Sequence, residues 1–227
     1  MKKILISVAI MFVSGALHAQ SGYPNKPITL VVPYPVGGSN DVFARLIAKS
    51  LGEALKVAVV VDNRPGASGS TGTLQVSKAA PDGYTLLAVS SSMTTNAAIQ
   101  EKSGFDPTKN LTAIAMLAKG PFIVAVNDSF PAKDPKQLVA LLKANPGKYN
   151  YASTGNGTSQ HLTGELFKMQ NKLFITHIPY RGTGPALQDL VAGQVDMMFD
   201  TLAGAAPFIK NGQLIAVAVT TSKRVDA

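Results

Sequence analysis

The chain has 227 residues, of which 46% are hydrophobic and 15% charged, and this composition excludes a disordered protein. Its formal net charge is +8, from 21 basic and 13 acidic residues. The basic residues are scattered without an arginine-rich strip or interleaved aromatic residues, so we expect ordinary surface lysines and no nucleic-acid partner. There is no cysteine, which excludes disulfides, catalytic thiols and cysteine zinc sites.

The N-terminus has the pattern of a secretory signal peptide. Lys2 and Lys3 precede the apolar run Ile4–Leu17, which is too short to span a bilayer comfortably, and Ala19 offers a small residue for cleavage. The alternative, a buried N-terminal helix, fits this pattern less well. We therefore expect residues 1–19 to be removed and the mature protein to be exported. The remaining chain, about 208 residues long, suits one large domain or two lobes.

Strand-like and helical segments alternate along the rest of the sequence. The predicted strands are Ile28–Val32, Val57–Val61, Thr85–Val89, Ile114–Leu117, Ile123–Val126, Tyr149–Ala152, Phe174–Ile178, Val195–Phe199 and Leu214–Val219. Predicted helices are Asn40–Leu55, Thr73–Lys78, Asp134–Ala144, a segment with Leu162, Leu166 and Met169 on one face, Pro185–Ala192 and Ala205–Ile209. In the first helix, apolar residues four apart (Phe43, Ile47, Leu51 and Leu55) predict the buried face, and Ser39 is the expected N-cap.

This alternation predicts an α/β protein with mostly parallel sheets and right-handed crossovers. A break near residues 105–113 divides the chain into a first lobe (20–112) and a second lobe (113–212). Residues 213–227 are expected to form a crossing strand that returns towards the first lobe. In such sheets ligands bind at the carboxyl ends of the strands, so the crevice between the lobes is the expected site.

Glycine and hydroxyl residues gather in the turns that follow several strands. These turns are Tyr34–Asp41, Ser90–Asn96, Thr154–His161, Tyr180–Pro185 and Asp200–Thr201. Helix capping could explain any one of them. Several such turns at strand ends could instead converge on one crevice, where N–H and hydroxyl donors suit a carboxylate. Asp41 is equally compatible with orienting its own turn and with contacting the ligand.

Two kinds of site find little support. No G-x-G-x-x-G or phosphate-binding P-loop motif is present, and Gly66–Gly72 is more simply a tight structural loop. A hydrolase could use Ser90–Ser92, His161 and Asp200, but no G-x-S-x-G elbow accompanies them. That hydrolase remains the alternative function, although His161 and His177 are more simply structural. The effector domain of a transcription regulator would need a DNA-binding segment where the signal peptide stands. With so few histidines we expect no metal and no other cofactor.

A series of short motifs runs in a characteristic order from Tyr23 to Arg224. They include Val32-Pro33-Tyr34-Pro35-Val36-Gly37-Gly38-Ser39-Asn40-Asp41, Asn63-Arg64-Pro65-Gly66-Ala67, Pro81-Asp82-Gly83-Tyr84-Thr85, Asn145-Pro146-Gly147-Lys148, Tyr151-Ala152-Ser153, Pro179-Tyr180-Arg181-Gly182 and Gly193-Gln194-Val195-Asp196. In order and spacing the chain resembles the Bug-type solute receptors of tripartite tricarboxylate transporters.

The resemblance implies a periplasmic, two-lobe Venus-flytrap protein without catalysis. Such a receptor closes on a small carboxylate and delivers it to a membrane permease, and we expect a monomer. Family ligands include di- and tricarboxylates, acidic amino acids and aromatic carboxylates. The loop matching Tyr34–Asp41 would hold a carboxylate through backbone groups and ordered water. The turns and the resemblance together give these candidate ligand-binding residues: Tyr34, Val36, Gly37, Gly38, Ser39, Asp41, Ser90, Ser91, Thr154, Gly155, Thr158, His161, Tyr180 and Asp200.

The sequence departs from the family pattern in two places. Val36 stands where the family often has proline or alanine, which could alter the shape of the loop or the width of the pocket. The chain also stops at Ala227, whereas family members continue and complete the first lobe. We therefore expect a C-terminally truncated receptor, with an incomplete first lobe and exposed apolar surface. A truncated receptor without function is the further alternative.

Overall fold

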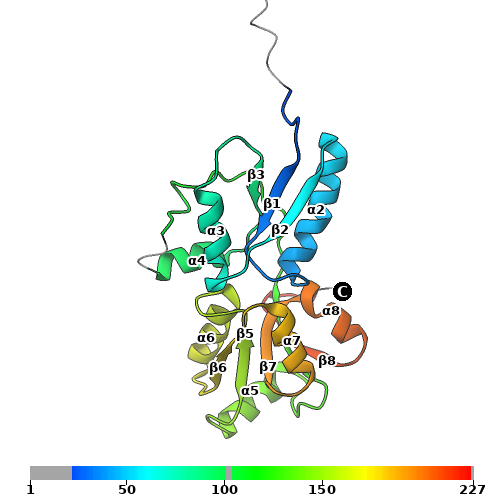
Figure 1. Cartoon of the computed structure of the whole chain (residues 1–227). Helices are drawn as coiled ribbons and strands as arrows, with labels where there is room; N and C mark the ends of the chain where they lie inside the picture. The colour runs from blue at the N-terminus through cyan, green and yellow to red at the C-terminus, as the bar shows by residue number, and fades with distance from the viewer. Residues whose placement is uncertain (1–21, 101–103, 226–227) are drawn as a thin grey trace, which may run out of the picture.

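The protein folds into two lobes, each built around one β-sheet (Figure 1). The computed structural model describes residues 22–100 and 104–225, so the predicted signal peptide lies outside the described residues. Within these residues, no helix is both long and apolar enough to cross a membrane. The chain enters the first lobe and crosses once to the second, and its last described residues lie close to the junction between the lobes (Figure 1).

The first lobe has a three-stranded, fully parallel sheet in the order β2-β1-β3. Its strands are β1 (Ile28–Val32), β2 (Val59–Asn63) and β3 (Thr85–Leu87), and its helices are α2 (Ser39–Leu55), α3 (Ser70–Ser77) and α4 (Ser92–Ile99). A short 3₁₀ turn at Ala67–Gly69 precedes α3. The core joins Leu30 and Val32 of β1 to Ala44 and Ala48 of α2.

The second lobe has a five-stranded sheet in the order β6-β5-β7-β4-β8. Its strands are β4 (Phe122–Asn127), β5 (Asn150–Ser153), β6 (Thr176–Pro179), β7 (Met197–Thr201) and β8 (Leu214–Val219). The helices are α5 (Pro135–Ala144), α6 (Ser159–Asn171), α7 (Thr183–Val191) and α8 (Leu202–Lys210). β5 pairs in parallel with β6 and β7, whereas β4 is antiparallel to β7 and β8.

Helices cover both faces of the second sheet. Successive side chains of a strand point to opposite faces, so apolar residues on both faces need a covering layer. Val124 and Val126 of β4 lie in a cluster with Leu138 of α5. Ile123 and Ala125 point to the opposite cluster, which includes residues of α7 and α8. This two-sided burial accounts for the nearly continuous apolar strands in this half of the sequence.

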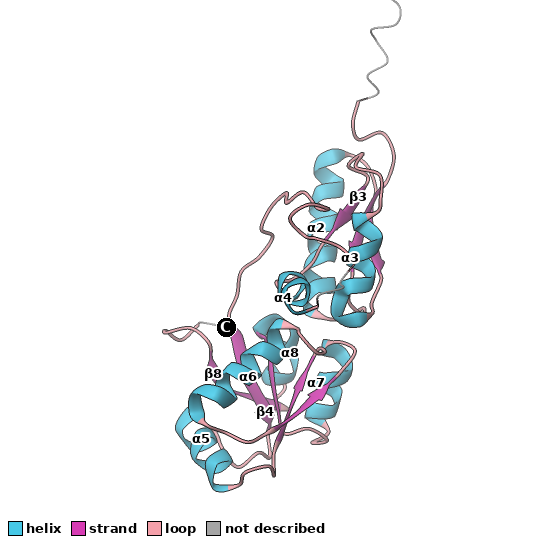
Figure 2. Cartoon of the chain, turned by 90° about the vertical axis from the view of Figure 1, so that its left-hand side faces the viewer, coloured by secondary structure: helices cyan, strands magenta, loops and turns pink. Residues whose placement is uncertain are grey.

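The predicted fold class is confirmed, and the structure changes several details. Leu214–Val219 is a strand, and it is hydrogen-bonded to β4 in the second sheet. Ile114–Leu117 is not a strand, because no described strand pairs with it; Ile114 is 78% exposed. In Figure 2 the segment between the lobes runs as an extended loop along one side of the molecule.

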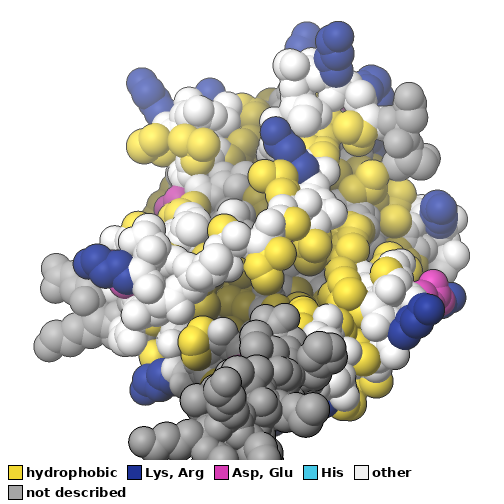
Figure 3. Space-filling view, turned by 90° about the horizontal axis from the view of Figure 1, so that it is seen from above, with side chains coloured by type: hydrophobic (Ala, Val, Ile, Leu, Met, Phe, Trp, Pro, Cys, Tyr) yellow, Lys and Arg dark blue, Asp and Glu magenta, His cyan; other side chains and the backbone are white. Residues whose placement is uncertain are grey.

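The face that α2 buries differs from the predicted one. In α2 the buried residues include Ala44 and Ala48, whereas Phe43 is 37% exposed. The small alanines let the helix lie close to the sheet, whereas Ile47, Leu51 and Leu55 of the predicted face are only partly buried. In α6, too, a small residue, Gly164, is buried, and Met169 is exposed. Seen from the first-lobe end, hydrophobic side chains form broad areas between scattered basic ones (Figure 3).

The predicted N-cap of α2 was also wrong. The cap is Gly38, which has extended backbone and makes no side-chain cap hydrogen bond. Ser39 is instead the first helical residue, and its hydroxyl contacts the other lobe. The N-terminus of α2 is therefore left without a local side-chain acceptor for its N–H groups.

Candidate functional site

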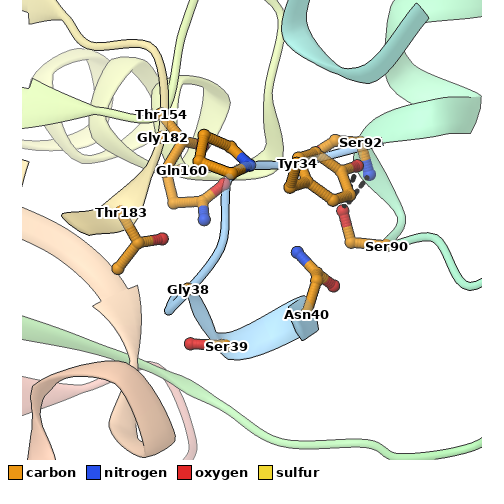
Figure 4. Close-up of a pocket in the computed structure, with 11 residues that line it drawn as sticks. Tyr34, Gly38, Ser39, Asn40, Ser90, Ser92, Thr154, Gln160, Gly182 and Thr183 are labelled. Atoms are coloured by element: carbon orange, nitrogen blue, oxygen red, sulfur yellow. Dashed lines mark hydrogen bonds between the residues drawn. The ribbon is translucent and has the colours of Figure 1, made fainter. Parts of the chain in front are cut away.

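A small cavity lies where the two lobes meet. Its volume is about 10 Å³, roughly enough for one water molecule. The strand ends of β1, β3, β5 and β6 lead directly into the segments around it. Eleven residues line it (Figure 4): Tyr34, Pro35, Gly38, Ser39, Asn40, Ser90, Ser92, Thr154, Gln160, Gly182 and Thr183.

Four helices begin at this cavity. Gly38 and Ser39 start α2, Ser92 starts α4, Gln160 lies in the first turn of α6, and Thr183 starts α7. Each helix N-terminus carries N–H groups without intrahelical partners and a partial positive charge. The cavity is therefore surrounded by hydrogen-bond donors that favour a negatively charged group.

Hydroxyl groups form the first-lobe wall. The Tyr34 and Ser90 hydroxyls are hydrogen-bonded, 2.8 Å apart, and the Ser92 N–H donates to Ser90 Oγ (Figure 4). Burial raises the pKa of Tyr34, so its hydroxyl stays protonated. This wall can donate hydrogen bonds to a ligand but carries no charge.

Asp41 organises the loop that begins α2. Its Oδ2 accepts from Gly37 N at 2.9 Å and from Arg45 Nε at 3.0 Å, and its Oδ1 accepts from Asn63 Nδ2 at 2.9 Å. Burial opposes the charged form, but these hydrogen bonds outweigh it and lower the pKa of Asp41. The structure thus places Asp41 as an orienting residue, away from the cavity lining.

The second-lobe wall comes from the turns after β5 and β6. In Figure 4 the side chains of Gln160 and Thr183 face Ser39 and Asn40 across the cavity. Thr158 caps α6: its hydroxyl accepts from His161 N and donates to Gly155 O at 2.7 Å. Thr158, His161 and Gly155, all three predicted as site residues, shape this turn and do not line the cavity.

The lobes touch through small polar groups. Ser39 Oγ lies 2.6 Å from Thr201 Oγ1, Ser91 Oγ lies 2.8 Å from Ser159 Oγ, and Thr95 Oγ1 donates to Gly157 O at 2.8 Å. At Gly182 the approach is so close that a Cβ would stand 2.7 Å from Pro35 Cγ of the other lobe. The structure therefore shows a closed arrangement of the lobes.

Asp200, at the end of β7, is fully buried. Neither of its carboxylate oxygens has a hydrogen-bond partner among the described residues. Burial raises the pKa of Asp200 to about 7, although the nearby Thr201 N–H and Gln160 amide favour the charged form. Asp200 is not exposed to the cavity but lies behind its wall.

Five of the fourteen predicted site residues line the cavity: Tyr34, Gly38, Ser39, Ser90 and Thr154. The others lie behind or beside it. Val36 is 66% exposed, and Tyr180 directs its hydroxyl to Asp189 Oδ2 at 2.7 Å. The lining residues that were not singled out are Pro35, Asn40, Ser92, Gln160, Gly182 and Thr183. All of them fall inside four of the five glycine- and hydroxyl-rich turns, which were the available signal.

The Ser/His/Asp arrangement of a hydrolase is not formed by the described residues. His161 Nδ1 accepts from Gly157 N, and its ring stacks on His177 with centroids 4.1 Å apart. Its nearest acid is Glu165, at 4.0 Å, and not Asp200. Because Asp200 has no hydrogen-bond partner in the part of the chain that the structure describes, no His–Asp pair exists there.

Two α/β lobes that close over a cavity at their strand ends define the periplasmic binding-protein class. Residues 43–227 match the family described as the tripartite tricarboxylate transporter family receptor. The chain belongs to this family of solute-binding receptors, as the resemblance to Bug-type proteins predicted.

Curated relatives agree with this family. The chain is 34% identical to protein BugT of Bordetella pertussis over 99% of its own length and 70% of that protein. It is also 34% identical to a Pseudomonas sp. strain P51 protein, named for the tcbD-tcbE intergenic region, over 98% of its length. The chain spans 67% of that Pseudomonas protein, and thus about two thirds of its curated relatives.

Solved structures share the fold closely. A protein described as a periplasmic transporter is 41% identical, with a TM-score of 0.87, over 90% of this chain and 69% of its own. A Rhodopseudomonas palustris protein solved with adipate is 35% identical, with a TM-score of 0.87, over 89% and 68%. The MatC protein of the same organism, with bound malate, is 33% identical with a TM-score of 0.82, over 89% and 69%.

Proposed function

We propose that this chain is a periplasmic solute-binding receptor that captures a small carboxylate between its lobes without chemically changing it. The observation that carries the proposal is the set of four helix N-termini around the cavity. A carboxylate accepts several hydrogen bonds at once and is favoured by the positive ends of helices. Adipate and malate in two related structures support the same ligand class.

The closed cavity is much smaller than such a ligand. Because its volume is about 10 Å³, a dicarboxylate can enter only when the lobes separate. The small polar contacts between the lobes, each worth about 1 kcal/mol, allow such a hinge motion. We propose that the ligand-bound form is then read by the membrane permease of a tripartite tricarboxylate transporter.

A thermal-shift experiment tests carboxylate binding. The purified chain is melted with adipate, malate and other small carboxylates, and with adipamide as a control that has the length of adipate but no charge. At a hundredfold excess over Kd, a true ligand raises the free energy of unfolding by about 2.7 kcal/mol. For a chain of this size the melting temperature then rises by roughly 5–10 °C.

The proposal is overturned if no carboxylate in the panel shifts the melting temperature or gives calorimetric heat. A shift by adipamide equal to that by adipate would also contradict it, because the helix N-termini should favour the charged ligand.

A further inference from the structure

Asp200 is a buried carboxyl group that no other part of the site explains. It is 0% exposed, and within the described ranges both of its oxygens lack a hydrogen-bond partner. An ionised carboxylate without partners is expensive to bury, whereas a protonated one is much less so. Asp200 also lies near the contact between the lobes, because it immediately precedes Thr201, whose hydroxyl contacts Ser39 of the first lobe.

The groups that face Asp200 come from several elements, and none of them titrates. Ile123 of β4 lies opposite it in the sheet register. Ser39 Oγ of α2 and Asp200 Oδ2 are neighbours above Gly204 of α8. A Cβ placed on Gly204 would stand 2.8 Å from each of these two oxygens. Gln160 of α6 lies near enough to favour the charged form. No ionised partner therefore offsets the burial of Asp200 among the described residues.

One of these neighbouring groups belongs to the other lobe. Ser39 starts α2 of the first lobe, whereas Asp200 and Thr201 belong to the second. When the lobes separate, Ser39 must leave and water can reach the Asp200 carboxyl group. Closing reverses this and removes the carboxyl group from water, so the burial of Asp200 depends on the conformation of the receptor.

We propose that Asp200 takes up a proton when the lobes close, so that the receptor binds its carboxylate together with one proton. This inference rests on the proposed receptor function and adds a regulation to it. The proton comes from solvent and returns there when the lobes open. Release of the ligand is thereby favoured wherever the surrounding pH is higher.

The pH window follows from the two states of Asp200. Burial raises its pKa from the ordinary 3.8 to about 7 when the lobes are closed. Between these values the closed form binds more protons than the open form, so falling pH favours closure. The affinity should weaken by up to about tenfold for each pH unit from pH 5.5 to 7, and level off above about pH 7.5.

The first experiment measures proton uptake on binding. Adipate and malate are titrated into the full chain by calorimetry, in buffers of different ionisation enthalpy, at pH 5.5 and pH 8. The wild type should take up about one more proton at pH 5.5 than D200N, and almost none more at pH 8. Protons that the ligand itself gains or loses on binding are the same for D200N and the wild type, so they cancel in this comparison.

D196N is the matched control. Asp196 also lies beside β7, but at the other end of the strand, where its Oδ2 accepts from Asn150 N at 2.8 Å. D196N should keep the proton uptake of the wild type. Equal uptake by the wild type and D200N at pH 5.5 would overturn the proposal.

A second experiment needs no ligand. Ser39 and Thr201 side-chain oxygens are 2.6 Å apart and the chain has no other cysteine, so S39C/T201C can cross-link the lobes in the closed form. Carbon-13 NMR should then find an Asp200 pKa near 7 in the oxidised protein and a lower pKa in the reduced protein, in which the lobes can separate. An unchanged pKa would overturn the proposal.

The two experiments separate the possible failures. If no carboxylate binds in the thermal-shift panel, the receptor proposal fails, and the cross-linked protein still decides whether closure protonates Asp200. If a carboxylate binds without Asp200-dependent proton uptake, the receptor proposal stands and only the proton coupling is wrong.

Discussion

Asp41 and Asp200 are both buried carboxyl groups, but their surroundings differ in hydrogen-bond donors. Asp41 accepts from Gly37, Arg45 and Asn63, and its pKa is lowered. Neither oxygen of Asp200 has a hydrogen-bond partner among the described residues, and burial raises the pKa of this carboxyl group. The first therefore fixes a loop in its charged form, whereas the second is suited to change its charge when its surroundings change.

His177 provides a test of stability at the scale of a single residue. Its Nε2 lies 2.6 Å from Ser153 Oγ, and its ring stacks on His161. Burial, and secondarily the neighbouring His161, lowers the pKa of His177 to about 4, from 6.5 in the unfolded chain. Between these values the unfolded chain binds more protons, so stability is complete above pH 6.5 and is lost as the pH falls towards 4.

We expect His177 to remove about 2 kcal/mol from the free energy of unfolding between pH 7 and pH 5. Urea unfolding of the wild type and H177Q at both pH values measures this. The fall should be smaller in H177Q by about that amount. If both proteins lose the same stability, His177 does not carry the effect.

At the scale of elements, α6 packs on β5 through one glycine. A Cβ on Gly164 would stand 2.6 Å from Cζ of Tyr151, a fully buried side chain. In an exposed helix, replacing glycine by alanine usually stabilises. Here the rigid ring cannot move aside, because Tyr151 also packs edge-on against Phe199.

We therefore expect G164A to destabilise the protein by about 2 kcal/mol through overpacking. The urea midpoint should fall without a change in the slope of the transition. G184A, in the first turn of α7, is the matched control, because nothing lies within 4 Å of its added Cβ. If G164A is as stable as G184A, the close packing of α6 on Tyr151 is wrong.

At the scale of the whole molecule, hydroxyl groups hold the lobes together. Ser159 is central to this contact: its Oγ lies 2.8 Å from Ser91 Oγ, and its N–H donates to Ser92 Oγ at 3.1 Å. No ion pair between the lobes is present among the described residues. The balance between open and closed forms should therefore respond to the loss of a single hydroxyl.

We expect S159A to weaken the closed form by about 1 kcal/mol, a shift of roughly fivefold towards the open form. Small-angle X-ray scattering of the ligand-free protein should show a larger radius of gyration. S129A is the control, because Ser129 bonds only within its own lobe, to Asn127 Oδ1 at 2.6 Å. An unchanged radius in S159A would contradict a closed form held by these hydroxyls.

The sequence by itself determined the α/β alternation, the family and the turns that surround the cavity. These depend on local periodicity and on the order of short motifs, which can be read along the chain. All of the lining residues fall within the predicted turns. Even where the buried face of α2 was wrong, its existence and approximate ends were right.

Only the tertiary structure decided which side chains of those turns face the cavity. Gln160 and Thr183 line it, whereas the predicted His161 turns to Gly157 and His177. The tertiary structure also decided that β4 is antiparallel to its neighbours, and that Ser39 Oγ of the other lobe and Asp200 Oδ2 lie near the same point above Gly204. The physical reason is that these features depend on contacts between residues far apart in the chain, and local patterns carry little information about such contacts.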